Sequence, residues 1–210
     1  MEESYLTVMD PVNVELIEKR SKFLGHMVHV KDRQEAERFI LEIRSQYKDA
    51  THNVPAYSIH KNGVMYCSDD GEPHGTSGKP ILEILKREQI YDVCVVVTRY
   101  FGGVLLGTGG LVGAYSSVCK KLIENADIAK CVLCARLKIF VAYGEFAKLQ
   151  HIIENCDVNV VEKNFLDKVE LELLIDVENK QGFEKLLAEK TGGGVTIENI
   201  GEAWERIKIQ

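Results

Sequence analysis

Glycine is concentrated in one part of this 210-residue chain, and this concentration limits the possible folds more than any other feature. Nine of the 17 glycines lie between Gly71 and Gly113. Glycine is favoured where the backbone needs a positive φ or where another group must approach it closely. The sequence therefore predicts two tight backbone segments, residues 69–80 and 99–110, each beside the start of a helix.

The composition is that of an ordinary globular protein, with 45% hydrophobic and 28% charged residues. The net charge of −6 lacks the basic surplus that accompanies non-specific nucleic-acid binding. The longest apolar stretch, Val93 to Val97, is far shorter than the roughly 20 residues of a membrane span, and the first residues do not resemble a signal peptide. We expect a cytoplasmic protein without membrane association and with reduced cysteines.

Residues before about 130 predict an α+β domain. Asp32 is placed to cap a helix, and Asn62-Gly63 between two short apolar runs indicates a hairpin. The Val-rich run from Val93 to Tyr100 indicates a buried strand. The expected elements are hairpins joining 12–20 to 22–30 and 57–60 to 64–67, helices at 33–47, 80–86 and 108–125, and the strand 93–100.

After Asp127 the pattern restarts in the order βαββαβ, which predicts a ferredoxin-like α+β domain. The expected elements cover residues 135–143, 145–156, 157–163, 169–177, 181–191 and 195–200. We therefore expect two domains, residues 1–130 and 135–210, joined near residues 128–134.

The two glycine-rich segments form a candidate site for an anion. Helix starts carry unpaired amide groups and a partial positive charge, which suit a phosphate oxygen. The candidate anion- or nucleic-acid-binding residues are Thr76, Ser77, Lys79, Arg99, Gly102, Gly103, Thr108, Gly109 and Gly110. In the alternative interpretation, the glycines only permit close packing of helix on strand. Neither segment matches a Walker A or a Rossmann fingerprint.

Other candidate centres have weaker support. Asp69, Asp70 and Glu72 could orient the cations or ligate a divalent metal, but we assign no metal or cofactor. The Cys131–Cys134 C-x-x-C stands alone, which favours an apolar linker or strand edge over a zinc site. No nucleophile stands beside a base, so we assign no catalytic residue.

Two long motifs resemble the signatures of the IMPACT/YigZ family. They are DDGEPHGTSGKP at residues 69–80 and VTRYFGGVLLGTGGLVGAY at residues 97–115. Weaker matches lie at Ser21-Lys22-Phe23 and at residues 50–53. The resemblance covers about residues 20–126, and the second half resembles the small C-terminal domain of bacterial two-domain members. Leu105 and Gly113 stand where relatives often carry a basic residue.

The resemblance implies a fold and a role. It implies an N-terminal domain like domain two of small-subunit ribosomal protein five and a C-terminal domain like the end of elongation factor G. His52 matches the family pattern, and we expect His52, Asp70 and Glu72 to orient the first glycine-rich loop. Eukaryotic relatives regulate translation by intercepting activation of an initiation-factor kinase, and bacterial relatives are suspected of binding RNA or the ribosome.

We therefore expect a translation-associated regulatory protein that binds RNA, the ribosome or another anionic partner through a glycine-rich cleft. A protein partner in translation control is a further possibility, and the sequence leaves the oligomeric state open. The main alternative is an enzyme acting on a phosphorylated small molecule, with Asp70 or Glu72 as base or metal ligand. The third is a protein-docking module with a flat apolar surface.

Overall fold

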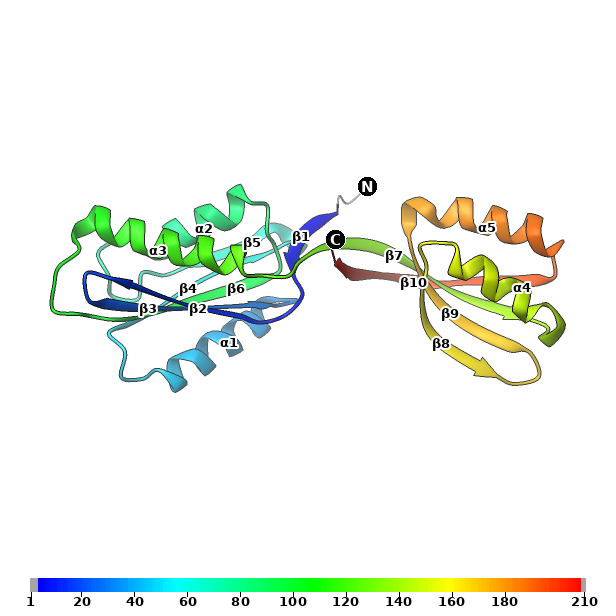
Figure 1. Ribbon diagram of the computed structural model, residues 1–210, viewed down its shortest axis with the longest axis horizontal. Helices are drawn as coiled ribbons and strands as arrows, with labels where there is room; N and C mark the ends of the chain where they lie inside the picture. Colours follow the sequence, from blue (N-terminus) through cyan, green and yellow to red (C-terminus); the bar gives the residue numbers. More distant parts are fainter. Residues whose placement is uncertain (1–3, 209–210) are drawn as a thin grey trace. The chain divides into compact units, whose positions relative to one another are not determined.

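The structure is a computed structural model that describes residues 4–208, and it divides into two compact units. The N-terminal unit comprises Tyr5–Lys130 together with the chain from Arg206, and the C-terminal unit is built on Cys131–Glu205. The described chain has a mixed α/β fold with five α-helices and two antiparallel sheets (Figure 1).

A five-stranded sheet in the order β2–β3–β6–β4–β5 is the centre of the N-terminal unit. Helix α1 packs on one face of this sheet, and α2 and α3 pack on the other (Figure 1). The elements are β1 (Tyr5–Val8), β2 (Val12–Glu18), β3 (Ser21–His29), α1 (Arg33–Gln46), β4 (His52–Ile59), a 3₁₀ turn (Lys61–Gly63), β5 (Val64–Cys67), α2 (Gly78–Arg87), β6 (Val93–Tyr100) and α3 (Gly107–Glu124).

Strand β6 is buried from Val93 to Arg99 because helices cover both faces of the sheet. Val95 and Val97 pack in the core under α2 and α3, whereas Cys94 and Val96 pack in the core under α1. A continuous apolar run is the pattern of a strand buried on both faces. The prediction of a buried strand over Val93–Tyr100 is confirmed.

Local capping and turn signals are also confirmed. The Asp32 carboxylate accepts a hydrogen bond from the Glu35 amide at 2.9 Å and so caps α1. Asn62 and Gly63 have φ values of 64° and 59° and connect β4 to β5, which pair antiparallel. These residues supply the positive φ that the turn requires.

The C-terminal unit has the predicted element order βαββαβ. Strand β10 pairs with β7, and the sheet continues through β9 to β8. Helices α4 and α5 bury Leu149, Phe183 and Leu187 against this sheet. The elements are β7 (Ile128–Val141), α4 (Tyr143–Glu154), β8 (Asn159–Phe165), β9 (Val169–Asp176), α5 (Val177–Thr191) and β10 (Val195–Lys208).

Strand β7 begins at Ile128, earlier than the predicted Ala135, so the C-x-x-C lies inside a strand. Cys131 and Cys134 are both buried, and their spacing of three places them on opposite faces of the strand. Burial raises the pKa of Cys134 to about 11, so its thiol is protonated at neutral pH.

The C-terminal unit ends at Glu205, whereas the predicted C-terminal domain extended over residues 135–210. Arg206 Nη1 donates to the carbonyls of Val8 at 2.9 Å and Met9 at 2.7 Å. These bonds place the chain from Arg206 with the N-terminal unit and not with the segment before it. Among the described residues, no helix combines the length and apolarity needed to cross a membrane.

Candidate functional site

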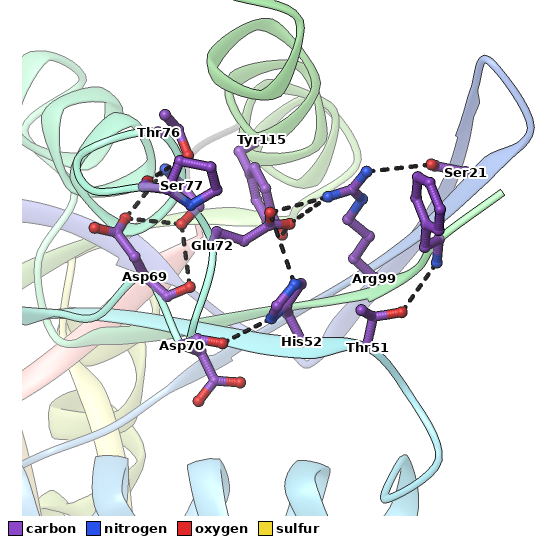
Figure 2. A network of polar contacts seen from close by, with 12 residues as sticks. Ser21, Thr51, His52, Asp69, Asp70, Glu72, Thr76, Ser77, Arg99 and Tyr115 are labelled. Carbon is purple, nitrogen blue, oxygen red and sulfur yellow. Dashed lines mark hydrogen bonds and ion pairs between the residues drawn. The ribbon is translucent and has the colours of Figure 1, made fainter. Parts of the chain in front are cut away.

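A buried polar network connects the first glycine-rich loop to the end of β6 (Figure 2). Strand pairing places Arg99 of β6 between Phe23 of β3 and His52 of β4. Arg99 is only 5% exposed, and its Nη1 donates to the two Glu72 carboxylate oxygens at 2.7 and 2.9 Å. The Tyr115 hydroxyl of α3 donates to the same carboxylate at 2.7 Å.

This network corrects the expected role of Arg99. We predicted that Arg99 would bind an anion, but the Arg99 guanidinium is buried and its charge is matched by Glu72. Burial and then the bond to Glu72 raise the pKa of Tyr115, so its hydroxyl stays protonated and donates. Arg99 and Glu72 therefore connect the loop to the core, and Glu72 is not a free base for catalysis.

Asp69 organises the first glycine-rich loop. Its carboxylate accepts from the amides of Gly75 at 2.7 Å, Ser77 at 3.2 Å and Gly78 at 3.0 Å. The Ser77 hydroxyl donates to Asp69 at 2.8 Å, and the Thr76 hydroxyl donates to the Pro73 carbonyl at 2.7 Å. The donors expected to receive a ligand anion here are therefore occupied by the protein's own carboxylate and carbonyl groups.

The charge state of Asp69 reflects two opposing effects. Burial acts to raise its pKa, but the amide donors and the Ser77 hydroxyl outweigh burial, so the pKa lies below the ordinary value of 3.8. An ionised Asp69 is therefore favoured at the start of α2, where the helix carries partial positive charge. The internal carboxylate occupies the position that we expected for an external anion.

His52 and Asp70 both form hydrogen bonds at the first glycine-rich loop. A carbonyl can only accept, so His52 Nδ1 donates to the Asp70 carbonyl, at 2.7 Å. The Asp70 side chain accepts from the Asn53 amide at 2.7 Å and from Arg44 at 2.6 Å. Glu72 lies 3.8 Å from His52 Nε2. These contacts fix the loop against β4 and α1.

The second glycine-rich segment is open by comparison. Gly102 donates its amide to Ser21 Oγ at 3.2 Å, and Gly103 has a φ of 80°. Thr108 and Gly109 lie in the exposed first turn of α3, and no side chain caps that helix. Its first amide groups therefore have no side-chain acceptor among the described residues.

The remaining predicted donors lie at separate places. Gly110 lies in α3, where an added Cβ would be 3.0 Å from the Cβ of Leu106. Lys79 is exposed on α2, and no ion pair links it to any residue between 4 and 208. Asp69, Asp70 and Glu72 do not converge: within the described chain, no group of three or more His, Cys, Asp or Glu side chains could hold a metal ion.

Sequence reasoning missed Ser21 and Tyr115 and named Asp69 only as a partner for the cations or a metal ion. Asp69 accepts from amides six to nine positions ahead of it, beyond the reach of the local capping pattern. Ser21 and Tyr115 come from β3 and α3, far from the loop in sequence. Ser21 lies in the weak Ser21-Lys22-Phe23 match, and that match was the available signal for it.

We expect Asp69→Asn to destabilise the N-terminal unit by about 2 kcal/mol at about pH 7, because charge-assisted bonds are weakened. Since folding lowers the pKa of Asp69, its stabilisation is complete above the unfolded pKa and is lost as the pH falls through the folded pKa. Urea unfolding followed by circular dichroism should show a smaller deficit at about pH 3 than at about pH 7. Asp10→Asn, an exposed control in the same unit, should cost little at either pH. A deficit that does not change with pH would contradict the assignment.

Comparison with known proteins gives matches for both units. The IMPACT N-terminal domain matches residues 19–123, and a domain of unknown function, DUF1949, matches residues 139–193. The IMPACT family member YvyE of Bacillus subtilis is 34% identical over 191 residues, covering 90% of this chain and 88% of that protein.

Two further comparisons extend over nearly the whole chain. The IMPACT family member YigZ of Escherichia coli is 28% identical over 203 residues, covering 95% of this chain and all of that protein. A crystal structure described only as that of a hypothetical protein has a TM-score of 0.62 at 27% identity and covers 96% of this chain. The motifs, their position in the fold and these matches lead to one conclusion: the chain belongs to the IMPACT family.

Proposed function

We propose that this protein is a translation-associated regulatory protein that binds structured RNA, including RNA of the ribosome, through the segment Phe101–Gly110. The observation that carries the proposal is the contrast between the two glycine-rich segments. The first segment is closed by Asp69, whereas the second exposes Phe101 and Leu105 directly after a buried strand. The translational role itself is the one implied by the family resemblance.

The cations that would meet RNA phosphates lie on the turn between β2 and β3. A Cβ on Gly102 would lie 2.1 Å from the backbone carbonyl of Arg20, so this turn contacts the open segment. Lys19 and Arg20 are both exposed. Phe101 is 46% exposed and offers a face on which a base can stack, while the cations approach the phosphates.

The proposed domain likenesses are supported by strand order alone. The C-terminal order β10–β7–β9–β8 with two helices on one face suits a ferredoxin-like domain resembling the end of elongation factor G. The likeness of the N-terminal unit to domain two of small-subunit ribosomal protein five remains part of the same proposal. Both likenesses support a partner in the translation machinery by analogy of fold.

Binding of a labelled RNA hairpin and of isolated ribosomes, measured at several salt concentrations near 0.1 M, tests the proposal. We expect the Lys19→Ala/Arg20→Ala variant to lose up to about two units of the salt slope, since each phosphate contact contributes about 0.9. Phe101→Ala should weaken binding by about 1–3 kcal/mol if one base stacks on it. The Lys185→Ala/Lys190→Ala control removes two exposed cations from α5 and should bind normally. Equal binding by all variants, or none by the wild type, would refute the proposal.

A further inference from the structure

A hollow of about 290 Å³ lies beside α1, strand β4 and the edge strand β5, formed by elements outside the open Phe101–Gly110 segment. It exists because α1 alone packs on this face of the sheet and leaves the edge at β5 uncovered. Its walls include Arg33, Glu37, Leu41 and Arg44 of α1, Tyr57 of β4 and Tyr66 of β5. We call it the α1 groove.

Tyr57 in the α1 groove has a polar group without a partner. Most of the residue is buried, but its hydroxyl is not one of the buried side-chain atoms without a partner, so it reaches the surface of the groove. It forms no hydrogen bond with any residue between 4 and 208, and burial raises the pKa of Tyr57. A protonated hydroxyl at the groove wall can donate a hydrogen bond to a ligand or accept one from it.

The flat and apolar surfaces of the groove lie next to this hydroxyl. The rings of Tyr57 and Tyr66 stack with centroids 5.2 Å apart and an angle of 23° between the planes. Tyr66 remains 44% exposed and Leu41 64% exposed, although both are large apolar side chains. A planar ring is the group that would extend the tyrosine stack and cover Leu41.

Each of the two groove arginines is paired with one carboxylate, Arg33 with Glu37 and Arg44 with Asp70. Arg33 uses Nε for Glu37 at 2.7 Å, and Arg44 uses Nη2 for Asp70 at 2.6 Å. Each guanidinium has five N–H groups, so both retain donors for a further acceptor. These remaining N–H groups suit one carboxylate or phosphate group.

We propose that the α1 groove binds a small aromatic anion. Its flat ring lies against Tyr66 and Leu41, a polar atom of the ligand bonds the Tyr57 hydroxyl, and its carboxylate or phosphate meets Arg44 and Arg33. The volume lies at the lower end of small-ligand pockets, which fits a mononucleotide or a single-ring acid. This site uses none of the residues of the proposed RNA-binding segment.

Titration of the ¹⁵N-labelled protein, followed by amide NMR shifts, tests this site with two probes. Adenosine 5′-monophosphate supplies the phosphate and 4-hydroxybenzoate the carboxylate, each added to about 10 mM, enough to saturate a millimolar site. We expect saturable shifts at Leu41, Tyr57 and Tyr66 with at least one probe. Inorganic phosphate and adenosine, which each lack half of the recognised chemistry, should bind at least about fivefold more weakly.

Variants separate the groove from incidental binding. Tyr57→Phe removes only the unpartnered hydroxyl and should weaken binding about fivefold, whereas Tyr91→Phe, outside the groove, should have no effect. Leu41→Glu places a carboxylate on an exposed helix position and should weaken binding about tenfold without unfolding the protein. The proposal is overturned if neither probe gives saturable shifts. It is also overturned if Tyr57→Phe and Leu41→Glu bind the probes as tightly as the wild type does. Lys19→Ala/Arg20→Ala should not change this binding, so failure here and failure of RNA binding are distinguishable.

Discussion

Replacing Arg99 with Met is expected to lower the free energy of unfolding of the N-terminal unit by about 3–5 kcal/mol. Methionine retains an unbranched apolar side chain but removes the guanidinium. The Glu72 carboxylate, with a side chain only 3% exposed, would then keep one hydrogen bond within residues 4–208, from the Tyr115 hydroxyl, with His52 Nε2 3.8 Å away. An uncompensated buried charge is costly, because water cannot replace the lost partner. Urea unfolding followed by circular dichroism gives the measurement.

A triple variant distinguishes this mechanism from simple loss of packing. Arg99→Met combined with Glu72→Leu and Tyr115→Phe removes all three polar partners and leaves apolar groups of comparable size. We expect this variant to be more stable than Arg99→Met alone, since no buried charge remains unpaired. A triple variant as unstable as the sum of the three single changes would contradict the account.

Gly102→Ala is expected to destabilise the N-terminal unit by about 3 kcal/mol, because over-packing against rigid neighbours forces the backbone to move. A Cβ at this position would lie 2.1 Å from both the carbonyl carbon and the oxygen of Arg20. Both atoms belong to the backbone of a turn, so no side-chain rotation can relieve the clash. Thermal unfolding should show the loss of stability. The hydrogen bond from the Gly102 amide to Ser21 Oγ should also weaken as the segment shifts.

Gly109→Ala provides the matched control in the same glycine-rich segment. A Cβ there meets no atom within 4 Å, and the residue lies in the first turn of α3. We expect stability to be unchanged or raised by up to about 1 kcal/mol, because alanine restricts the unfolded chain. Equal destabilisation by both alanine variants would show that close approach at Gly102 is not the cause.

Features determined by neighbouring residues were predictable from the sequence. Asp32 caps α1 by accepting a hydrogen bond from the Glu35 amide three residues ahead, and Asn62-Gly63 forms a hairpin turn. The buried strand Val93–Tyr100 was also predictable, because helices on both faces of a sheet require a continuous apolar run. In each case the residues that cause the structure lie within one turn or one strand.

The candidate site depended on contacts that no local pattern contains. Glu72 meets Arg99 across 27 positions and Tyr115 across 43 positions. A glycine-rich sequence indicates that another group lies close to the glycine backbone, but it does not identify that group. In the first segment the group is the Asp69 carboxylate, and in the second it is the Arg20 backbone. The amides of the first loop therefore looked open in the sequence, although the fold supplies their acceptor.

Because Arg206 returns to the carbonyls of Val8 and Met9, the stretch Cys131–Glu205 is topologically an insertion within the N-terminal unit. Truncation after Lys130 would thus delete a piece of the unit it was meant to isolate. An excision that respects this division would remove residues 131–205 and keep the chain from Arg206.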